Sequence, residues 1–277
     1  KQTQSISLDL QNINTSGKGM MVTRINDDSN SKEKIPFTHQ NNKLVLNLTD
    51  YKRTNDTLQL NIFYKGIPAD GLIISKNKYG NRTFFSDNWP DRAHYWLPCN
   101  DRPDDKASFE FLVTAPDHYQ VISNGVLVEE SNLKNNLKLT HWKEEISLPT
   151  KIMVIGVASF AVNYIGNVND CIPVSSWVFP ENKEAGFYDY AMAKDILNFY
   201  INYIGPYPYK KLANVQSKTI FGGMENAGAI FYHENSVVGH REEESLFAHE
   251  IVHQWFGDMA SEQNFSHLWL SEGFATY

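Results

Sequence analysis

Two histidines four residues apart, His249 and His253, lie in the segment HEIVHQWFGD and could share one metal ion. Each residue of an α-helix turns by about 100°, so positions i and i+4 lie on the same face. Glu250 borders that face, where its carboxylate could accept a proton from a reacting water. Taken alone, this short pattern also fits a packed or exposed pair of histidines.

A third possible ligand follows in LWLSEGFATY, where Glu272 lies near the start of another expected helix. Two imidazoles and one carboxylate with a fourth position open are typical of a catalytic zinc site, whereas structural zinc sites are closed by four protein ligands. We therefore predict one Zn²⁺ per chain, bound by His249, His253 and Glu272. Glu250 would be the general base that takes a proton from the zinc-activated water as it attacks a carbonyl.

The elements that precede this segment have a different character. Up to about residue 180, short segments such as DTLQLNIFYKG alternate apolar and polar residues and predict β-strands. The dipeptide Asn124-Gly125 predicts a tight hairpin turn, because both residues tolerate positive φ. We expect an all-β N-terminal domain over residues 1–180, with a saddle-like or sandwich-like arrangement.

Helical spacing begins after residue 180. One helix is predicted over residues 184–204 and is ended by Gly205-Pro206. A second is predicted over residues 241–257, with three glutamates at its positive end and Gly257 at its stop. Its other face carries three apolar residues that would pack against the domain: Phe247, Ile251 and Trp255. The predicted fold class is α+β, and residues 181–277 form the start of a catalytic domain.

Composition excludes several classes of function. The chain has 277 residues and a formal net charge of −7 without a basic run, so we expect no nucleic-acid partner. Its longest apolar run, residues 152–162, is too short to cross a bilayer and predicts a buried strand rather than a membrane segment. The chain opens without Met, which fits a processed N-terminus and favours an extracytoplasmic location over a cytoplasmic one.

The sequence resembles the gluzincin aminopeptidases, a family that includes aminopeptidase N and the leukotriene hydrolases. The resemblance rests on HEIVHQWFGD, WLSEGFA and FGGMEN, and it extends from about residue 60 through YKGIPADGL, WLPCNDRPDDKASFEF and GPYPYKKL. It implies a thermolysin-like catalytic domain that hydrolyses the N-terminal peptide bond of peptides. His249, His253 and Glu272 would be the zinc ligands, and Glu250 would be the base.

The GGMEN stretch implies that the enzyme removes residues from chain ends. Such an enzyme must hold the free α-ammonium of its substrate, which a carboxylate binds by charge-assisted hydrogen bonds. In the family the glutamate of this motif has that role, which here is Glu225. Its neighbours Gly222, Gly223, Met224 and Asn226 would contact the substrate backbone, which could approach the glycines as an added strand. Without the family, the stretch is typical of a glycine-rich turn.

Some features depart from the family pattern. The region before Pro98-Cys99 lacks the usual second amine-binding Glu or Gln, which leaves Asp87 as the nearest acidic candidate. The family's oxyanion-binding Tyr and its C-terminal helical region would both follow Tyr277, so we expect this portion to have low or no activity alone. Gly223 resembles the leukotriene hydrolase branch.

These observations leave alternatives to a zinc aminopeptidase. Gly223 suggests an epoxide hydrolase with aminopeptidase activity, and a zinc-containing module that binds peptide N-termini without cleaving them is a further possibility, as is an endopeptidase. Asp258 and His267 are open candidates for outer hydrogen-bond partners of the metal ligands. The histidines without ligand spacing are expected in surface or packing positions: His94, His118, His141, His233, His240 and His267.

Overall fold

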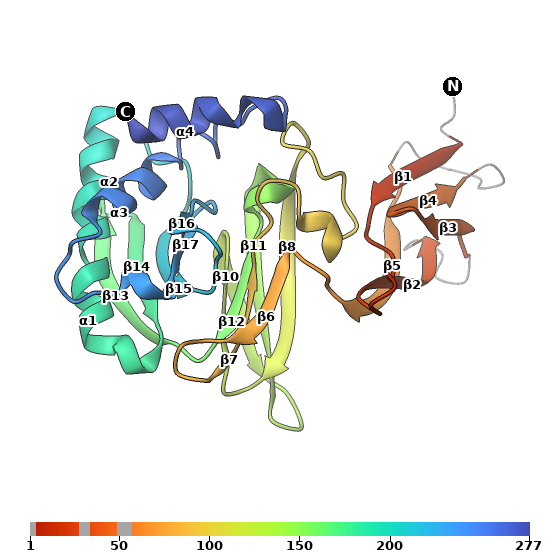
Figure 1. Cartoon of the computed structure of the whole chain (residues 1–277), viewed down its shortest axis with the longest axis horizontal. Coiled ribbons are helices and arrows are strands. Elements are labelled where there is room, and N and C mark those ends of the chain that lie inside the picture. Colours follow the sequence, from red (N-terminus) through yellow and green to blue (C-terminus); the bar gives the residue numbers. More distant parts are fainter. Residues whose placement is uncertain (1–3, 28–33, 49–56) are drawn as a thin grey trace. The chain divides into compact units, whose positions relative to one another are not determined.

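The computed structural model describes residues 4–27, 34–48 and 57–277. The chain divides into two compact units, residues 1–72 with 91–101 and residues 73–90 with 102–277. Strands dominate the chain up to residue 178 and helices become frequent from residue 183, so the predicted α+β class is confirmed (Figure 1). No helix in the described ranges is both long and apolar enough to cross a membrane.

The first unit consists of antiparallel strands. A three-stranded sheet has the order β1 (Ser5–Asp9), β4 (Lys43–Asn47), β3 (Phe37–Gln40), and β2 (Gly19–Asp27) pairs with β5 (Leu60–Ile67). Alternation along β4 sends Leu44 and Leu46 into the interior, where both are fully buried with Leu10.

The second unit contains three sheets. The first has the order β6 (Leu72–Lys76), β7 (Arg82–Ser86), β12 (Ile155–Ala158), β9 (Gln120–Ser123). The second has the order β10 (Val126–Asn132), β11 (Leu137–Pro149), β8 (Lys106–Pro116). The third has the order β13 (Ala161–Val168), β14 (Ile172–Val178), β15 (Leu212–Ser217), β17 (Ala229–His233), β16 (Gly223–Met224). This last sheet takes strands from both sides of residue 180, and the predicted boundary there stays a prediction.

The five-stranded sheet is packed on both faces, which follows from the alternation of its side chains. In β17, Ile230 and Tyr232 join the core beneath the helices, whereas Phe231 joins the core shared with β7, β9 and β12. The helices over the first face are α1 (Lys183–Tyr190), α2 (Met192–Tyr203) and α3 (Glu244–Val252) (Figure 1). The sheet therefore gives α3 a rigid support.

The predicted hairpin at Asn124-Gly125 is wrong, because β9 and β10 on its two sides belong to different sheets. Gly125 has the expected positive φ of 70°. The side chain of Asn124 is fully buried, however, and its Nδ2 donates to the carbonyls of Ile152 and Ala227, at 2.9 and 2.7 Å. These distant contacts make the dipeptide a junction between sheets.

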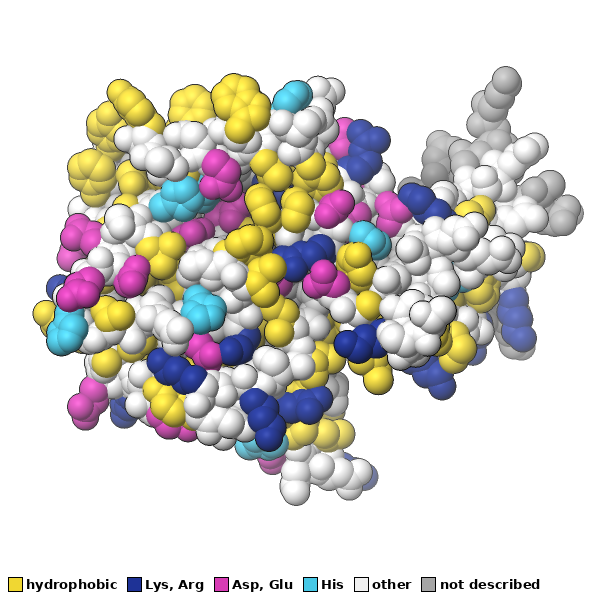
Figure 2. Space-filling model, viewed as in Figure 1, with side chains coloured by type: hydrophobic (Ala, Val, Ile, Leu, Met, Phe, Trp, Pro, Cys, Tyr) yellow, Lys and Arg dark blue, Asp and Glu magenta, His cyan; other side chains and the backbone are white. Residues whose placement is uncertain are grey.

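The helices also differ in extent from the sequence prediction. The helix expected over 184–204 is two helices, and the break follows Asp189, a buried residue whose carboxylate accepts hydrogen bonds from the backbone of residues 238–241. The helix expected over 241–257 ends at Val252. A fourth helix, α4 (Leu268–Thr276), begins four residues before Glu272. Exposed apolar side chains gather on α4 and the end of α2, among them Trp269 and Tyr203 (Figure 2).

Candidate active site

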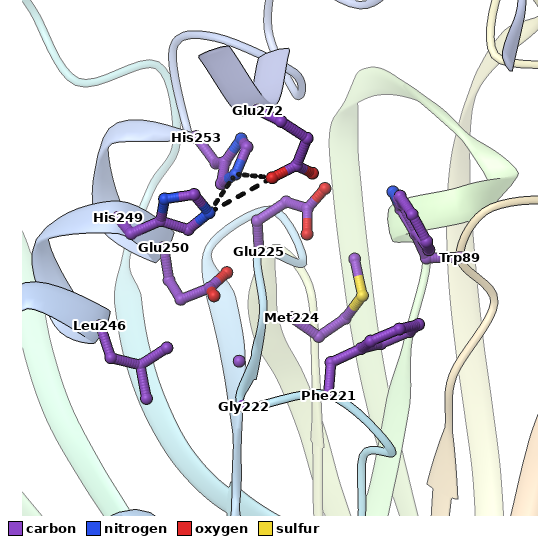
Figure 3. A pocket seen from close by; sticks show the side chains of 11 residues that line it. Trp89, Phe221, Gly222, Met224, Glu225, Leu246, His249, Glu250, His253 and Glu272 are labelled. Atoms are coloured by element: carbon purple, nitrogen blue, oxygen red, sulfur yellow. Dashed lines mark hydrogen bonds and ion pairs between the residues drawn. The ribbon is translucent and has the colours of Figure 1, made fainter. Parts of the chain in front are cut away.

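Three side chains from α3 and α4 converge on one point. The Nε2 atoms of His249 and His253 lie 3.1 Å apart, and Oε2 of Glu272 lies 3.4 Å from the first and 3.6 Å from the second (Figure 3). Ligand atoms at zinc distances of 2.0–2.2 Å in a tetrahedral site are roughly 3.3–3.6 Å from one another. Two of the three separations lie in this range and the third is slightly shorter, so the triangle of donor atoms fits one zinc ion at the edge of the cavity.

The packing of α3 fixes this geometry. Phe247 and Ile251 are fully buried and Trp255 is nearly so, as predicted for the face opposite the histidines. His253 itself is 1% exposed, and its Nδ1 donates to the carbonyl of Phe256 at 2.9 Å, in the turn that follows the helix. This hydrogen bond orients the imidazole so that Nε2 points at the other two donor atoms. Metal-ligating histidines are commonly oriented by such a hydrogen bond from their second ring nitrogen.

The electrostatics of the cluster favour a positive charge at the same point. Burial opposes protonation of His253, but the carboxylates of Glu225, Glu272 and Glu250 outweigh it and raise the pKa of His253 to about 10. Hydrogen bonds from His249 and His253 hold the pKa of Glu272 well below its ordinary range. A cation held between these groups would be stabilised for the same reason.

Glu225 and Glu250 add two nearly buried carboxylates, which are 4% and 5% exposed. Burial and the neighbouring charge of Glu225 raise the pKa of Glu250 to about 8. Oε1 of Glu225 is buried and has no hydrogen-bond partner within the part of the chain that the structure describes. A buried acceptor without a hydrogen bond lowers the stability of the fold, so this oxygen is suited to accept a hydrogen bond from a bound ligand.

These groups line a cavity of about 310 Å³. The edge strand β16 forms one wall, with Gly222 preceding it, and Trp89, Phe221 and Leu246 add apolar surface (Figure 3). A Cβ at position 223 would overlap the side chain of Glu250, so any larger residue there would require this carboxylate to move. Gly223 therefore lets the edge strand pass directly beside this carboxylate.

A fully buried amide, Gln254, joins α3 to the segment that carries Glu225. Its Nε2 donates to the carbonyl of Glu225 at 2.6 Å and to Oδ2 of Asp258 at 3.0 Å. Its Oε1 accepts from the backbone N–H of Gly228 at 2.7 Å and from the hydroxyl of Tyr207 at 3.2 Å. Two of these hydrogen bonds, to Glu225 and Gly228, hold α3 and this segment in register, and the other two satisfy the rest of the amide.

Several sequence-predicted residues lie outside the cavity lining. Asn226 is fully buried behind the strand, and His267 is exposed before α4. The carboxylate of Asp258 contacts Gln254 instead of a metal ligand. Asp87, the weak candidate for a second amine contact, is fully buried and accepts hydrogen bonds from Thr219 and Ile220, which places it behind the cavity.

Sequence reasoning missed Trp89. It lines the cavity two residues after Asp87, in the same region that was searched for an acidic residue. Its ring meets Phe221 edge to face, with centroids 5.3 Å apart. Only the position of the tryptophan next to the expected amine-binding region could have suggested it, because Phe221 lies far away in the sequence.

Comparison with known proteins identifies the family. Residues 1–152 match the peptidase M1 N-terminal domain, and residues 188–277 match the peptidase family M1 domain. The chain belongs to peptidase family M1. The predicted resemblance to zinc aminopeptidases is therefore confirmed, and the catalytic-type segment from α1 onward is the start of the M1 domain.

Relatives within peptidase family M1 are aminopeptidases. Glutamyl aminopeptidase from Bos taurus is 28% identical over 204 residues, covering 69% of this chain and 21% of that protein. Probable aminopeptidase 1 from Sulfurisphaera tokodaii is 25% identical over 97% of this chain and 34% of its own length. An M1 zinc metallopeptidase from Deinococcus radiodurans has the same fold, with a TM-score of 0.81, 22% identity and coverage of 99% of this chain and 62% of that one. This chain thus spans a fifth to a third of the length of these curated relatives.

Proposed function

We propose that this M1 chain carries the zinc centre and substrate anchor of an aminopeptidase, which removes the first residue of peptides with a free N-terminus. The observation that supports it most is the triangle of His249, His253 and Glu272 donors beside two buried carboxylates. Zinc held there would supply Lewis-acid activation of water and of the scissile carbonyl.

The two buried carboxylates would have different tasks. Glu250 lies on the same helix as the histidines, and its raised pKa suits a base that must take a proton from water near neutral pH. Glu225, with its unpartnered Oε1, would receive the substrate's α-ammonium. The free edge of β16 would pair with the substrate backbone, in the manner of an added strand.

The same arrangement explains why an aminopeptidase is preferred to an endopeptidase. Glu225 lines the same cavity as the donor triangle, so an α-ammonium held by its carboxylate would keep the first peptide bond of the substrate next to the candidate zinc site (Figure 3). Gly223 was the residue that suggested an epoxide hydrolase. Its close contact with the Glu250 side chain is a structural reason for a glycine at this position, independent of that activity.

Metal analysis and a single substitution test the proposal. Purified protein supplied with Zn²⁺ should hold one zinc per chain. In the full chain, Glu250→Gln should keep that zinc but lose roughly 10²–10⁴-fold in turnover of an aminoacyl amide, the range expected for a general base. An acetylated form of the same substrate should not be cleaved. Absence of stoichiometric zinc, or full activity of the variant, would contradict the proposal.

A further inference from the structure

The helix α3 leads into a short loop, residues 256–262, which we call the clamp loop. The carbonyl of Phe256 in this loop accepts the hydrogen bond from Nδ1 of His253 at 2.9 Å. Oδ2 of Asp258 accepts a hydrogen bond from Nε2 of Gln254 at 3.0 Å. The clamp loop therefore orients one candidate zinc donor directly, and it also holds the amide that joins α3 to the other half of the site.

The clamp loop is closed on itself and packs against α4. The N–H of Gly257 donates to the carbonyl of Ala260 at 3.1 Å, which closes a tight turn. The ring of Phe256 stacks on that of Phe274 in α4, with centroids 5.0 Å apart and an angle of 14° between the planes. A shift of the loop would therefore displace the donors on both helices.

Two lysines attach the clamp loop to the sheet formed by β8 and β11. These strands are antiparallel, so Lys106 at the start of β8 and Lys151 just after β11 lie at the same end of the sheet. Nζ of Lys106 donates to the carbonyls of Asp258 and Met259, at 3.3 and 2.9 Å. Nζ of Lys151 donates to Oε1 of Glu262 at 2.6 Å. Both ends of the loop beyond the turn are thus held by ammonium groups.

The ion pair between Lys151 and Glu262 is buried, with each side chain only 1% exposed. Removing two charges from water opposes their attraction, and apolar residues of similar volume often stabilise a fold as well or better. In addition, Oε2 of Glu262 is buried without a hydrogen-bond partner among the described residues. Stability alone is therefore a poor reason for this pair. A charge-assisted hydrogen bond differs from an apolar contact in fixing the direction and distance between its two groups.

We infer that Lys151 and Glu262 are positioning residues, which hold the clamp loop where the Phe256 carbonyl orients His253 and which thereby raise the affinity for zinc. This inference rests on the proposed function. Neither lysine nor glutamate of this attachment lines the cavity, so the pair acts on the metal through the loop and His253. Lys106 adds a second attachment of the same loop.

Removing both charges at once tests the inference without leaving one of them buried and unpaired. In the full chain, Lys151→Met/Glu262→Met should weaken zinc binding by about tenfold, the lower end of the effect of losing an outer partner. Competition with a chromophoric chelator measures this. Denaturation of the metal-free protein should show no loss of stability, because the apolar pair avoids desolvation of the charges. A pair with a purely structural role would lower stability and leave zinc affinity unchanged.

Bound Co²⁺ supplies a spectroscopic measure of the same effect. Its visible absorption depends on the arrangement of the ligands, so the double variant should show bands that differ from those of the wild type. The matched control is Lys138→Met/Glu130→Met, which removes an ion pair of 2.7 Å from the other end of β11. This control should keep both the zinc affinity and the Co²⁺ spectrum of the wild type.

A milder variant is available if the double variant does not fold. Lys106→Met removes the other ammonium at a half-buried position and should weaken zinc binding by about threefold or more. Zinc affinity within about twofold of the wild type, together with an unchanged Co²⁺ spectrum, would overturn the inference in whichever of these variants is folded. Equal weakening in the control pair would overturn it as well.

The outcomes separate this inference from the proposed function. A wild-type protein that holds one zinc keeps the proposed zinc centre standing, whether or not the variants change its affinity. A wild-type protein that fails to bind zinc would overturn both.

Discussion

Two polar clusters lie on opposite sides of the segment 225–228 and differ in how their hydrogen bonds are used. On the cavity side, Glu225 keeps an unpartnered oxygen and the pKa of Glu250 is raised. On the inner side, Gln254 uses both ends of its amide, and the Lys211 ammonium donates to the carbonyls of Ser123 and Gly228. The first cluster is suited to bind a ligand, and the second to hold the first in place.

This difference teaches that buried polar residues should be sorted by unmet hydrogen bonds before a chemical role is given to them. Asp258 and Gln254 follow His253 closely in the sequence, and either could have been taken for part of the chemistry. Oδ2 of Asp258 accepts from Gln254, and its buried Oδ1 has no hydrogen-bond partner among the described residues; because neither residue lines the cavity, an unmet hydrogen bond indicates a ligand site only where it faces the cavity. Substitutions in the cavity cluster should therefore impair ligand binding, whereas substitutions in the inner cluster should lower the stability of the fold.

The largest effect is expected in the cavity cluster. Glu272→Gln removes the only carboxylate of the donor triangle, and zinc affinity should fall by more than about 100-fold, since loss of an outer partner alone costs 10–100-fold. Competition with a chromophoric chelator measures this. Glu242→Gln, the same change at an exposed position before α3, is the matched control and should bind zinc like the wild type. Unchanged affinity in Glu272→Gln would show that the triangle is not the metal site.

The second-largest effect, a loss of stability, is expected in the inner cluster. Gln254→Leu leaves the Gly228 N–H and the Glu225 carbonyl without their partner, and the free energy of unfolding should fall by about 2–3 kcal/mol. Denaturation in the presence of a chelator isolates this loss from metal binding. The exposed Gln263→Leu should change stability by less than about 0.5 kcal/mol. If both variants were equally stable, the inner cluster would have no structural role.

The smallest effect is a pH dependence at Lys211. Desolvation lowers the pKa of its ammonium to about 7, although Glu144 partly opposes this. Between that value and the ordinary pKa near 10.5, the unfolded chain binds one more proton, so stability rises with pH. Relative to Lys211→Met, the wild type should gain at most about 1.4 kcal/mol between pH 7 and pH 8 and nothing below pH 7. Parallel stability profiles from pH 6 to 9 would contradict this.

The sequence predicted that His249, His253 and Glu272 lie together, because they fall within 24 residues and the two histidines follow helical spacing, which is a local property. Their binding of zinc stays a prediction. The buried face of α3 followed from the same periodicity. The turn at Asn124-Gly125 and the break between α1 and α2 could not be predicted, because distant contacts of Asn124 and Asp189 decide them. Trp89 was missed for the same reason, since its partner Phe221 lies far away in the sequence, in the bend before β16.

The hydrogen bond between Asp87 and Thr219 joins residues 132 positions apart. The entropy of closing so long a loop must be overcome before this bond forms, so pairings of this kind are expected late in folding. During synthesis α3 emerges after Thr219, and Trp89 is made more than a hundred residues before Phe221, the ring that it contacts in the cavity wall. A partly folded chain can therefore contain the helix of candidate metal ligands and still lack the wall of the cavity that Trp89 and Phe221 form, which makes the shape of the cavity a more demanding measure of correct folding than metal content.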